Sequence, residues 1–417
     1  MASSVEAAVA DAHRREWAFV LAATVRVTGD IDLAEECVQD AYARALASWP
    51  NSGVPAKPGA WLTTVARRRA IDLKRRGSTH DRSMSLLVRT TAKDPDEMEI
   101  DVEANGGEVA DDRLRLIFTC CHPAIAPEAQ VALTLRLLCG LTTVEVARAF
   151  LVNETAMAAR ITRAKKKIAA AHVPYRVPSV EELPARVDAV LTVVHLMFAT
   201  GHTAPAGADL IRRDLVERAL DLGRMLHALL PDDPDVTGLL ALILLTDARR
   251  PARVDGRGHL VLLADQDRSD WDHSVIGEGV TLVRDALKRR PPGRFALMAA
   301  IAAVHAEAPS WNATDWREIV GLYDLLLAIW PSPVVALNRA VAIGFADGPE
   351  AGLTALDALA TEPVLAAYSY LASSRADFLR RLGRVAEARL AYQEALMLSE
   401  NAVERDFLED CLLRLDG

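Results

Sequence analysis

Two groups of basic residues in the first half of the chain have the composition of a polyanion-binding site. Between residues 61 and 89, and again between residues 136 and 176, eight basic residues outnumber two acidic ones. The whole chain carries a formal net charge of −9, so both groups are local exceptions on an acidic protein. Because phosphate neutralisation dominates nucleic-acid binding, two separate basic groups predict two separate contacts with a nucleic acid.

The first basic group lies on a predicted helix at residues 60–76. An aromatic ring beside basic groups is typical of surfaces that stack on unpaired bases and hold the phosphate backbone. The alternative interpretation is structural, because Trp61 lies on an apolar stripe and a single aromatic residue there usually packs in the core. The candidate DNA-binding residues of this helix are Trp61, Arg67, Arg68, Lys74 and Arg75.

Two further helices are expected before this one. Residues 12–49 divide at Gly29, and Asp30 or Asp32 can cap the second helix. Residues 50–59 are rich in Pro and Gly and separate the second helix from the basic one. The second helix carries an apolar stripe with one residue about every turn, formed by Leu33, Cys37, Ala41, Ala45 and Trp49.

Residues 141–171 have the pattern of a helix-turn-helix. Thr142 or Thr143 can cap a short helix, residues 151–153 form a tight turn, and Asn153 can cap a second, basic helix. A basic second helix suits the major groove of DNA, although an ordinary hairpin with a solvated basic face shows the same pattern. The candidate DNA contacts of the second helix are Thr155, Arg160, Arg163, Lys165 and Lys166.

The order of these segments resembles the extracytoplasmic-function sigma factors of bacterial RNA polymerase. Residues 30–76 resemble region 2 of that family and residues 141–168 resemble region 4, with an acidic linker between them. The resemblance implies that region 2 recognises and melts the −10 element of promoter DNA, and that region 4 reads the −35 element and rests on the polymerase β flap. It also implies that the clamp helices of the β′ subunit bind Glu35, Glu36, Gln39, Asp40 and Tyr42.

The second half of the chain carries weak internal repeats. Residues 350–359 resemble residues 387–396 at an offset of 37, and residues 318–327 lie 32 positions before the former. Periods on either side of about 34 predict tetratricopeptide-like helix pairs. Residues 259–272 match a signature of the long C-terminal extension found in one subgroup of these sigma factors. That resemblance implies a built-in regulatory role, with an unknown ligand or protein as a further partner.

Cysteine usage argues against disulfides and metal. The five cysteines are odd in number and irregular in spacing, which fits a reducing cytoplasm. Cys120, Cys121 and His122 have the residue types of a zinc site, but no second ligand pair stands at a usable spacing. We therefore expect adjacent core cysteines and no metal.

Catalytic and membrane functions find no support in the residue pattern. The acidic residues near His259, namely Asp265, Asp267 and Asp272, could form an acid-base or metal cluster, but caps and turns are the expected role. The chain has no Gly-rich phosphate loop and no nucleophile elbow, so no catalytic residue and no cofactor are expected. No uninterrupted apolar run is long enough to span a bilayer, and no membrane contact is expected.

The sequence therefore predicts an all-α protein with a region 2 helical bundle, a region 4 helix-turn-helix, and a large α-helical C-terminal domain with tetratricopeptide-like repeats. The function expected is promoter-specific transcription initiation. Two alternatives are a helix-turn-helix regulator with a partner-binding repeat domain that never engages polymerase, and an enzyme within residues 180–290. The expected domains are region 2 at residues 1–78, the acidic linker at 79–110, region 4 at 111–173, a helical extension at 174–293, and the repeats at 294–417.

Overall fold

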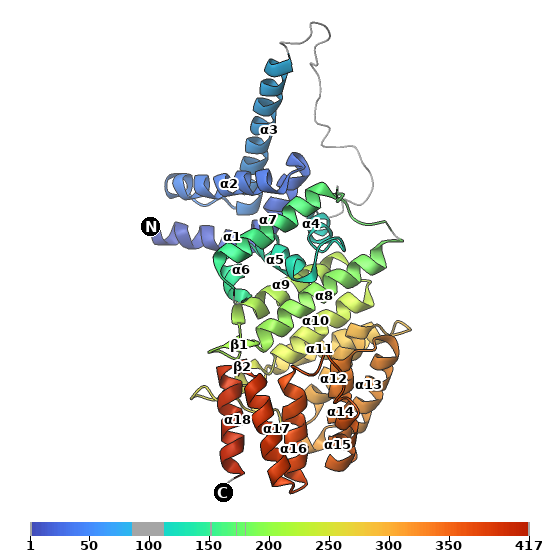
Figure 1. Ribbon diagram of the computed structural model, residues 1–417. Coiled ribbons are helices and arrows are strands. Elements are labelled where there is room, and N and C mark those ends of the chain that lie inside the picture. Colours follow the sequence, from blue (N-terminus) through green and yellow to red (C-terminus); the bar gives the residue numbers. More distant parts are fainter. Residues whose placement is uncertain (1, 86–111, 151, 172, 180, 416–417) are drawn as a thin grey trace. The chain divides into compact units, whose positions relative to one another are not determined.

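The computed structural model describes residues 2–85, 112–150, 152–171, 173–179 and 181–415 (Figure 1). Over these residues the predicted all-α fold class is confirmed. The strands among them are β1 (Ala206–Gly207) and β2 (Glu400–Asn401), which form one short parallel pair with Ala206 opposite Glu400. The chain divides into two compact units, Met1–Val193 and Val194–Gly417.

The first unit begins with three helices that pack on one another, α1 (Ala2–Thr28), α2 (Ile31–Ser52) and α3 (Pro58–Ser85). The predicted break at Gly29 is confirmed, and Gly29 adopts a positive φ of 69° that favours glycine. The cap of α2 is Asp30, whose side chain accepts a hydrogen bond from the backbone N–H of Leu33. The core of the three helices contains Trp17, Leu21, Cys37, Val38, Trp49, Leu62 and Ala66.

Helix α3 is longer than predicted, because it continues to Ser85 instead of ending near residue 76. The predicted linker at residues 79–110 therefore begins within a helix, and from residue 86 onward it lies outside the described residues.

Four shorter helices follow in the same unit, α4 (Asp112–Cys120), α5 (Pro127–Leu137), α6 (Thr143–Ala149) and α7 (Glu154–Ala170). Thr142 and Glu145 form a reciprocal capping box at the start of α6, since each backbone N–H donates to the other side chain. Asn153 caps α7 by accepting a hydrogen bond from the Ala156 N–H at 2.7 Å. The predicted caps and the helix pair at residues 141–171 are confirmed.

Helix α8 (Leu183–His202) contains the boundary between the two units. The chain before it belongs with the first unit, because the Tyr175 hydroxyl donates to the Ala22 carbonyl at 2.9 Å and Arg186 donates to the Phe118 carbonyl. Helix α8 is, by length and composition alone, long and apolar enough to cross a membrane, although Arg186 and Asp188 interrupt its apolar residues. A buried core helix passes the same test, and Val187, Leu191 and other apolar residues of α8 are buried.

The second unit is centred on the apolar helix α10 (Pro234–Asp247), whose residues from Val236 to Leu245 are buried. It packs against α9 (Arg213–Leu229), α11 (His273–Leu287) and α12 (Arg294–Glu307). The short helices η2 (Arg250–Ala252) and η3 (Arg268–Asp270) lie between α10 and α11 in the chain.

The rest of this unit is a row of helices in which each packs against the next in the chain (Figure 1). After η4 (Trp311–Ala313) the row is α13 (Trp316–Ile329), α14 (Pro333–Ala346), α15 (Pro349–Asp357), α16 (Ser369–Arg381), α17 (Val385–Leu398) and α18 (Ala402–Arg414). The three repeat segments lie in α13, α15 and α17. Each of these helices is followed by a second one, α14, α16 or α18, so one repeat corresponds to a pair of helices. That they are tetratricopeptide-like stays a prediction.

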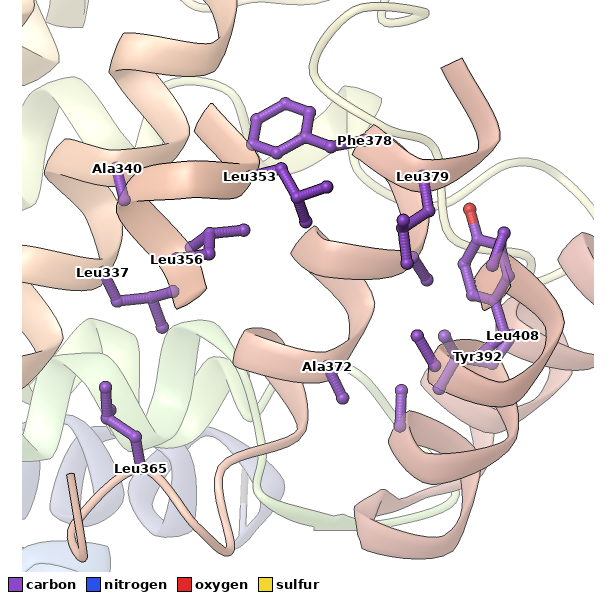
Figure 2. Packing of buried hydrophobic residues seen from close by; sticks show 14 residues of the cluster. Leu337, Ala340, Leu353, Leu356, Leu365, Ala372, Phe378, Leu379, Tyr392 and Leu408 are labelled. Carbon is purple, nitrogen blue, oxygen red and sulfur yellow. The ribbon is translucent and has the colours of Figure 1, made fainter. Parts of the chain in front are cut away.

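A buried apolar cluster joins α14 to α18, and Figure 2 shows Leu353 of α15 beside Phe378 of α16. Glycine permits this packing, because a Cβ atom on Gly344 would come within 2.1 Å of the Phe378 ring and one on Gly352 within 2.5 Å. The helices approach so closely here that no larger residue fits without moving a neighbour.

Gly238 in α10 has a similar constraint, since an added Cβ would lie 2.5 Å from the Ala296 backbone nitrogen. We expect Gly238→Ala to lower the free energy of unfolding by about 1–3 kcal/mol through overpacking. The matched control is Gly277→Ala in α11, where no atom lies within 4 Å of the added Cβ. That control should raise the free energy by about 0.5–1 kcal/mol, because Ala favours helix over Gly. Denaturant unfolding of both variants measures the contrast, and equal effects would contradict the close approach.

Candidate nucleic-acid interface

Helix α3 places its predicted DNA-binding residues in unlike surroundings. Trp61 is half-buried, and its ring lies 5.5 Å from the buried ring of Trp49 in an edge-to-face arrangement. This contact supports the alternative in which Trp61 packs in the protein core, at least for the side of its ring that meets Trp49. Arg68 and Arg75 are exposed, and Arg67 is half-buried.

Two further cations of α3, Lys74 and Arg69, make specific contacts. Lys74 donates a hydrogen bond from its Nζ to the Val27 carbonyl at 2.7 Å, near the C-terminal end of α1. Arg69 forms an ion pair with Asp40 of α2 at 2.9 Å. The basic residues of α3 are therefore divided between solvent-exposed positions and contacts that hold the three-helix bundle together.

Helix α7 presents most of its predicted DNA-binding residues to solvent. Thr155 lies exposed in the first turn, and Arg163 and Lys166 are exposed further along the helix. The Arg160 guanidinium lies 5.4 Å from the centroid of the Phe150 ring, a cation–π contact that holds it beside the turn. On the opposite side Met157, Ile161, Ala164 and Ile168 are buried, so burial orients the basic side outward.

A hollow of 300 Å³ lies where α5 and α7 meet, lined by residues that include Glu128, Ala129, Arg160, Arg163 and Lys167. Three of these five side chains are cationic. The hollow is therefore a basic recess beside the second helix of the helix-turn-helix, in which a phosphate group would be stabilised.

The predicted polymerase-binding residues lie on α2, where only some of them reach solvent. Glu36 and Gln39 are exposed, and Asp40 is the partner of Arg69. Tyr42 is buried, its hydroxyl donates to the Ala12 carbonyl at 3.3 Å, and burial raises its pKa well above the ordinary value. Tyr42 thus belongs to the packing between α1 and α2.

Glu35 is also buried, with 5% of its surface exposed, although it is charged. Its partners come from the helix-turn-helix part of the unit: Arg136 of α5 at 2.8 Å, and Lys165 of α7. Lys165 also contacts Asp32 at 2.6 Å. The structure therefore brings one predicted polymerase-binding residue into contact with one predicted DNA-binding residue.

Sequence reasoning missed the residues that join the two halves of this unit. The Trp17 indole N–H donates to the Leu137 carbonyl at 3.0 Å, and Gly140 lies so close that an added Cβ would be 2.9 Å from the Trp17 ring. Trp17 and Leu137 are 120 positions apart in the chain. No local pattern signals such a contact, because neither residue has an unusual spacing within its own helix.

The cysteines lie where the core interpretation places them. Cys120 and Cys121 are buried, and burial raises the pKa of the Cys121 thiol to about 12. Cys37 and Cys139 are buried as well, and Cys411 is half-buried. Among the described residues no three His, Cys, Asp or Glu side chains are grouped as metal ligands would be.

The acidic residues after His259 serve mainly as caps. Asp267 accepts from the Ser269 N–H, and Asp272 caps α11 by accepting from the Ser274 and Val275 N–H groups. Asp265 lines a hollow of 420 Å³ whose other walls include Leu262, Trp311, Phe345 and Phe378. Aromatic and aliphatic side chains form most of this wall, and Asp377, Arg380 and Arg381 add charged groups to it.

Family models match the chain in three places. Sigma-70 region 2 matches residues 13–79, sigma-70 region 4 matches residues 115–168, and a family of unknown function, DUF6596, matches residues 186–287. The chain is similar to a protein of Rhizobium meliloti (strain 1021) described as uncharacterized, with 42% identity over 390 residues, 93% of this chain and 91% of the relative. No solved structure matches the chain significantly.

The two matched regions, a three-helix bundle followed by a helix-turn-helix, define a class of transcription factor. The chain belongs to the sigma-70 family, as an extracytoplasmic-function-type sigma factor with a long C-terminal extension. It directs promoter-specific transcription initiation, and its partners are the RNA polymerase core and promoter DNA. Sigma-70 proteins are transcription factors and not enzymes. The alternative of a helix-turn-helix regulator that never binds RNA polymerase does not agree with the two sigma-70 matches.

Proposed function

We propose that the two exposed basic surfaces of the first unit divide the promoter between them. Helix α3, through Trp61 and the cations Arg67, Arg68, Lys74 and Arg75, contacts the −10 element. Helix α7, through Thr155, Arg160, Arg163 and Lys166, contacts the −35 element. The observation that carries this proposal is the outward orientation of Arg163 and Lys166 over a fully buried apolar face of α7.

Lys165 is the remaining predicted −35 contact of α7, and it can contact DNA only after its present ion pairs are broken. Its side chain is 14% exposed, and Asp32 and Glu35 hold it away from solvent. It reaches a phosphate only when those contacts are released.

We further propose that α2 binds the clamp helices of the polymerase β′ subunit and that the α4–α7 part rests on the β flap. Glu36 and Gln39 are the exposed members of the α2 set and are available for direct contact. Asp40 and Tyr42 contribute by holding α2 against α3 and α1, through Arg69 and the Ala12 carbonyl. The proposed place of action is the cytoplasm, where bacterial RNA polymerase works.

The C-terminal extension has a regulatory role in this proposal, through a ligand or protein not yet identified. The predicted divisions at residues 174–293 and 294–417 correspond to the α8–α11 and α12–α18 parts of the chain. Cutting after Ala171 is a poor test of this role, because it removes the Tyr175 and Arg186 contacts to the first unit. A substitution within the second unit tests the extension without touching those contacts.

Replacing both Arg160 and Arg163 by Ala should weaken promoter binding and flatten its salt dependence. Each lost phosphate contact lowers the slope of log K against log salt by about 0.9, so a change of about 1.8 is expected. Fluorescence anisotropy of the holoenzyme on promoter DNA across a salt series measures it. Arg176→Ala is the control, since Arg176 is exposed but lies beyond α7. If purified core with the wild-type chain gives no promoter-dependent transcript, the proposal fails as a whole.

Charge reversal at Glu36→Lys should weaken binding to purified core polymerase about tenfold, ~1.4 kcal/mol, through loss of a favourable interfacial charge. Glu6→Lys makes the same change at an exposed position on α1 and should bind core as the wild type does. Surface plasmon resonance with immobilised core measures both. Equal affinities for the two variants would place the polymerase contact outside α2.

Phe378→Ala removes a fully buried ring of the α14–α18 cluster and should lower the stability of the second unit by about 3–5 kcal/mol. We expect altered transcription from target promoters in cells, with core binding by the first unit unchanged in vitro. Leu390→Ala is the control, because Leu390 is 67% exposed on α17. Unchanged transcription in cells, together with confirmed loosening by limited proteolysis, would contradict a regulatory extension.

A further inference from the structure

A hollow of about 770 Å³ lies within the second unit, where residues of the DUF6596 segment meet the helices α16 to α18. One wall comes from α8, α10 and α12. The other comes from the start of α16, the end of α17 and the first turn of α18. The volume falls within the range of small-molecule sites in proteins, which is about 300–1,000 Å³. None of the contacts proposed above with promoter or polymerase uses this hollow.

The α8 wall presents one face of a helix to the hollow. Four of its residues stand at positions i, i+3, i+4 and i+7, which places their side chains on the same side of α8. They are His195, Phe198, Ala199 and His202. The His202 ring stacks on the Phe198 ring with 5.4 Å between centroids, and the His195 ring meets the Phe295 ring of α12 edge-on at 5.6 Å. This wall is therefore built mainly of flat rings.

Both histidines of this wall are uncharged at pH 7. Burial lowers the pKa of His195 to about 4, with a smaller contribution from Arg294. Burial also holds the pKa of His202 well below its ordinary value, and Arg253 and Arg249 add to the effect. The two rings therefore bring hydrogen-bonding nitrogen atoms and apolar surface to the hollow, but no positive charge.

The opposite wall carries a carboxylate that no cation neutralises. Glu404, in the first turn of α18, accepts hydrogen bonds from the Tyr370 hydroxyl and from the Ser399 hydroxyl, the latter at 3.3 Å. Within the described part of the chain its carboxylate forms no ion pair. Arg253 is near enough for Glu404 to act on its pKa, but its guanidinium donates to a carbonyl and a hydroxyl of the α8 wall instead.

Two tyrosine rings stand beside this carboxylate. The Tyr368 and Tyr370 rings lie 5.1 Å apart, and burial together with the charge of Glu404 raises the pKa of both hydroxyls. The described residues that line the hollow include one further acid, Glu400, and no Lys or Arg. Negative charge beside aromatic faces is the combination that stabilises an organic cation.

The two walls are joined by contacts at one edge of the hollow. The Asn401 side-chain amide donates to the Ala204 carbonyl at 3.0 Å and to the Asp209 carbonyl at 2.9 Å. The strands β1 and β2 pair beside it, with Ala206 opposite Glu400. The hollow is thus formed before a ligand enters, which lowers the entropic cost of binding.

We propose that this hollow binds a small organic amine, with the ammonium group against Glu404 and the two tyrosine rings and the apolar part against the α8 and α10 wall. The inference rests on the regulatory role proposed for the C-terminal extension, and it names the class of ligand that acts there. A carboxylate or phosphate ligand is disfavoured, because the lining presents two acids and no cation. A bound amine contacts α8 and α18 together, so it stabilises the arrangement in which the two walls are joined.

Three ligands that differ mainly in charge test the site on the full-length protein: phenylethylamine, the uncharged phenylethanol and the anionic phenylpropionate. A ligand that binds the native state stabilises it, so phenylethylamine should raise the temperature of thermal unfolding as its concentration rises. The alcohol should give a smaller shift and the carboxylate none. No shift with the amine, or an equal shift with the carboxylate, would overturn the proposal.

Isothermal titration calorimetry of variants locates the bound amine. Glu404→Gln keeps an acceptor for the Tyr370 and Ser399 hydroxyls but removes the charge, so affinity for phenylethylamine should fall about tenfold. Glu394→Gln makes the same change at an exposed position of α17 outside the hollow and should bind as the wild type does. Equal affinities for these two variants would place the amine elsewhere and contradict the site.

If Glu404→Gln fails to fold by circular dichroism, Ala199→Phe provides the comparison. Ala199 is an exposed residue that lines the hollow, so the added ring occupies the space of the ligand without entering the core. This variant should lose amine binding, whereas Leu196→Phe should keep it, because Leu196 is 42% exposed on α8 and does not line the hollow. Wild-type affinity in a folded Ala199→Phe chain would reject the hollow as the binding site.

Transcription with purified core polymerase separates this inference from the proposed function. Phenylethylamine should change the yield of promoter-dependent transcript severalfold with the wild type and leave it unchanged with Glu404→Gln. An unchanged yield with the wild type at saturating amine would overturn a regulatory role for the hollow. Absence of any promoter-dependent transcript would instead reject the proposed function, while calorimetry still decides whether the hollow binds an amine.

Discussion

The pairing of the buried Glu35 carboxylate with Arg136 and Lys165 is the interaction on which the first unit depends. A buried charge costs several kcal/mol unless it is paired, so the cations must stay close as long as the carboxylate is shielded from water. Both cations come from helices that lie more than 90 positions later in the chain. Removing one partner of such a pair typically costs about 3–5 kcal/mol, which makes the docked arrangement specific.

The second unit depends on a different constraint, which is close helix packing through small residues. Gly238, Gly344 and Gly352 each stand where a Cβ atom would meet a neighbour at under 3 Å. Asn401 adds a buried polar tie, because its side-chain amide donates to the Ala204 and Asp209 carbonyls, almost 200 positions earlier. These hydrogen bonds join the segment before α9 to the start of α18.

Local signals in the sequence predicted most of the helices and their ends. Asp30, Thr142 and Asn153 cap helices because a short polar side chain before an apolar repeat satisfies free backbone N–H groups, a property of a few neighbouring residues. The apolar face of α7 followed from its 3.6-residue period in the same way. The length of α3 did not, because Gly77 directly after three basic residues has the pattern of a helix end, and the polar residues beyond it lack an apolar period.

The sequence by itself determined the class of protein and the identity of its basic and acidic surfaces, because residue type and order carry the charge and the helix pattern. Only the tertiary structure decided which of those side chains are free. Arg69 pairs with Asp40, Lys74 ends at the Val27 carbonyl, Tyr42 is buried, and Lys165 is held by Glu35. Charge is a property of a residue, whereas availability depends on what folds against it. Contacts across a hundred or more positions leave no trace in local spacing, so the ion pairs that join α5 and α7 to α2 could be read only from the fold.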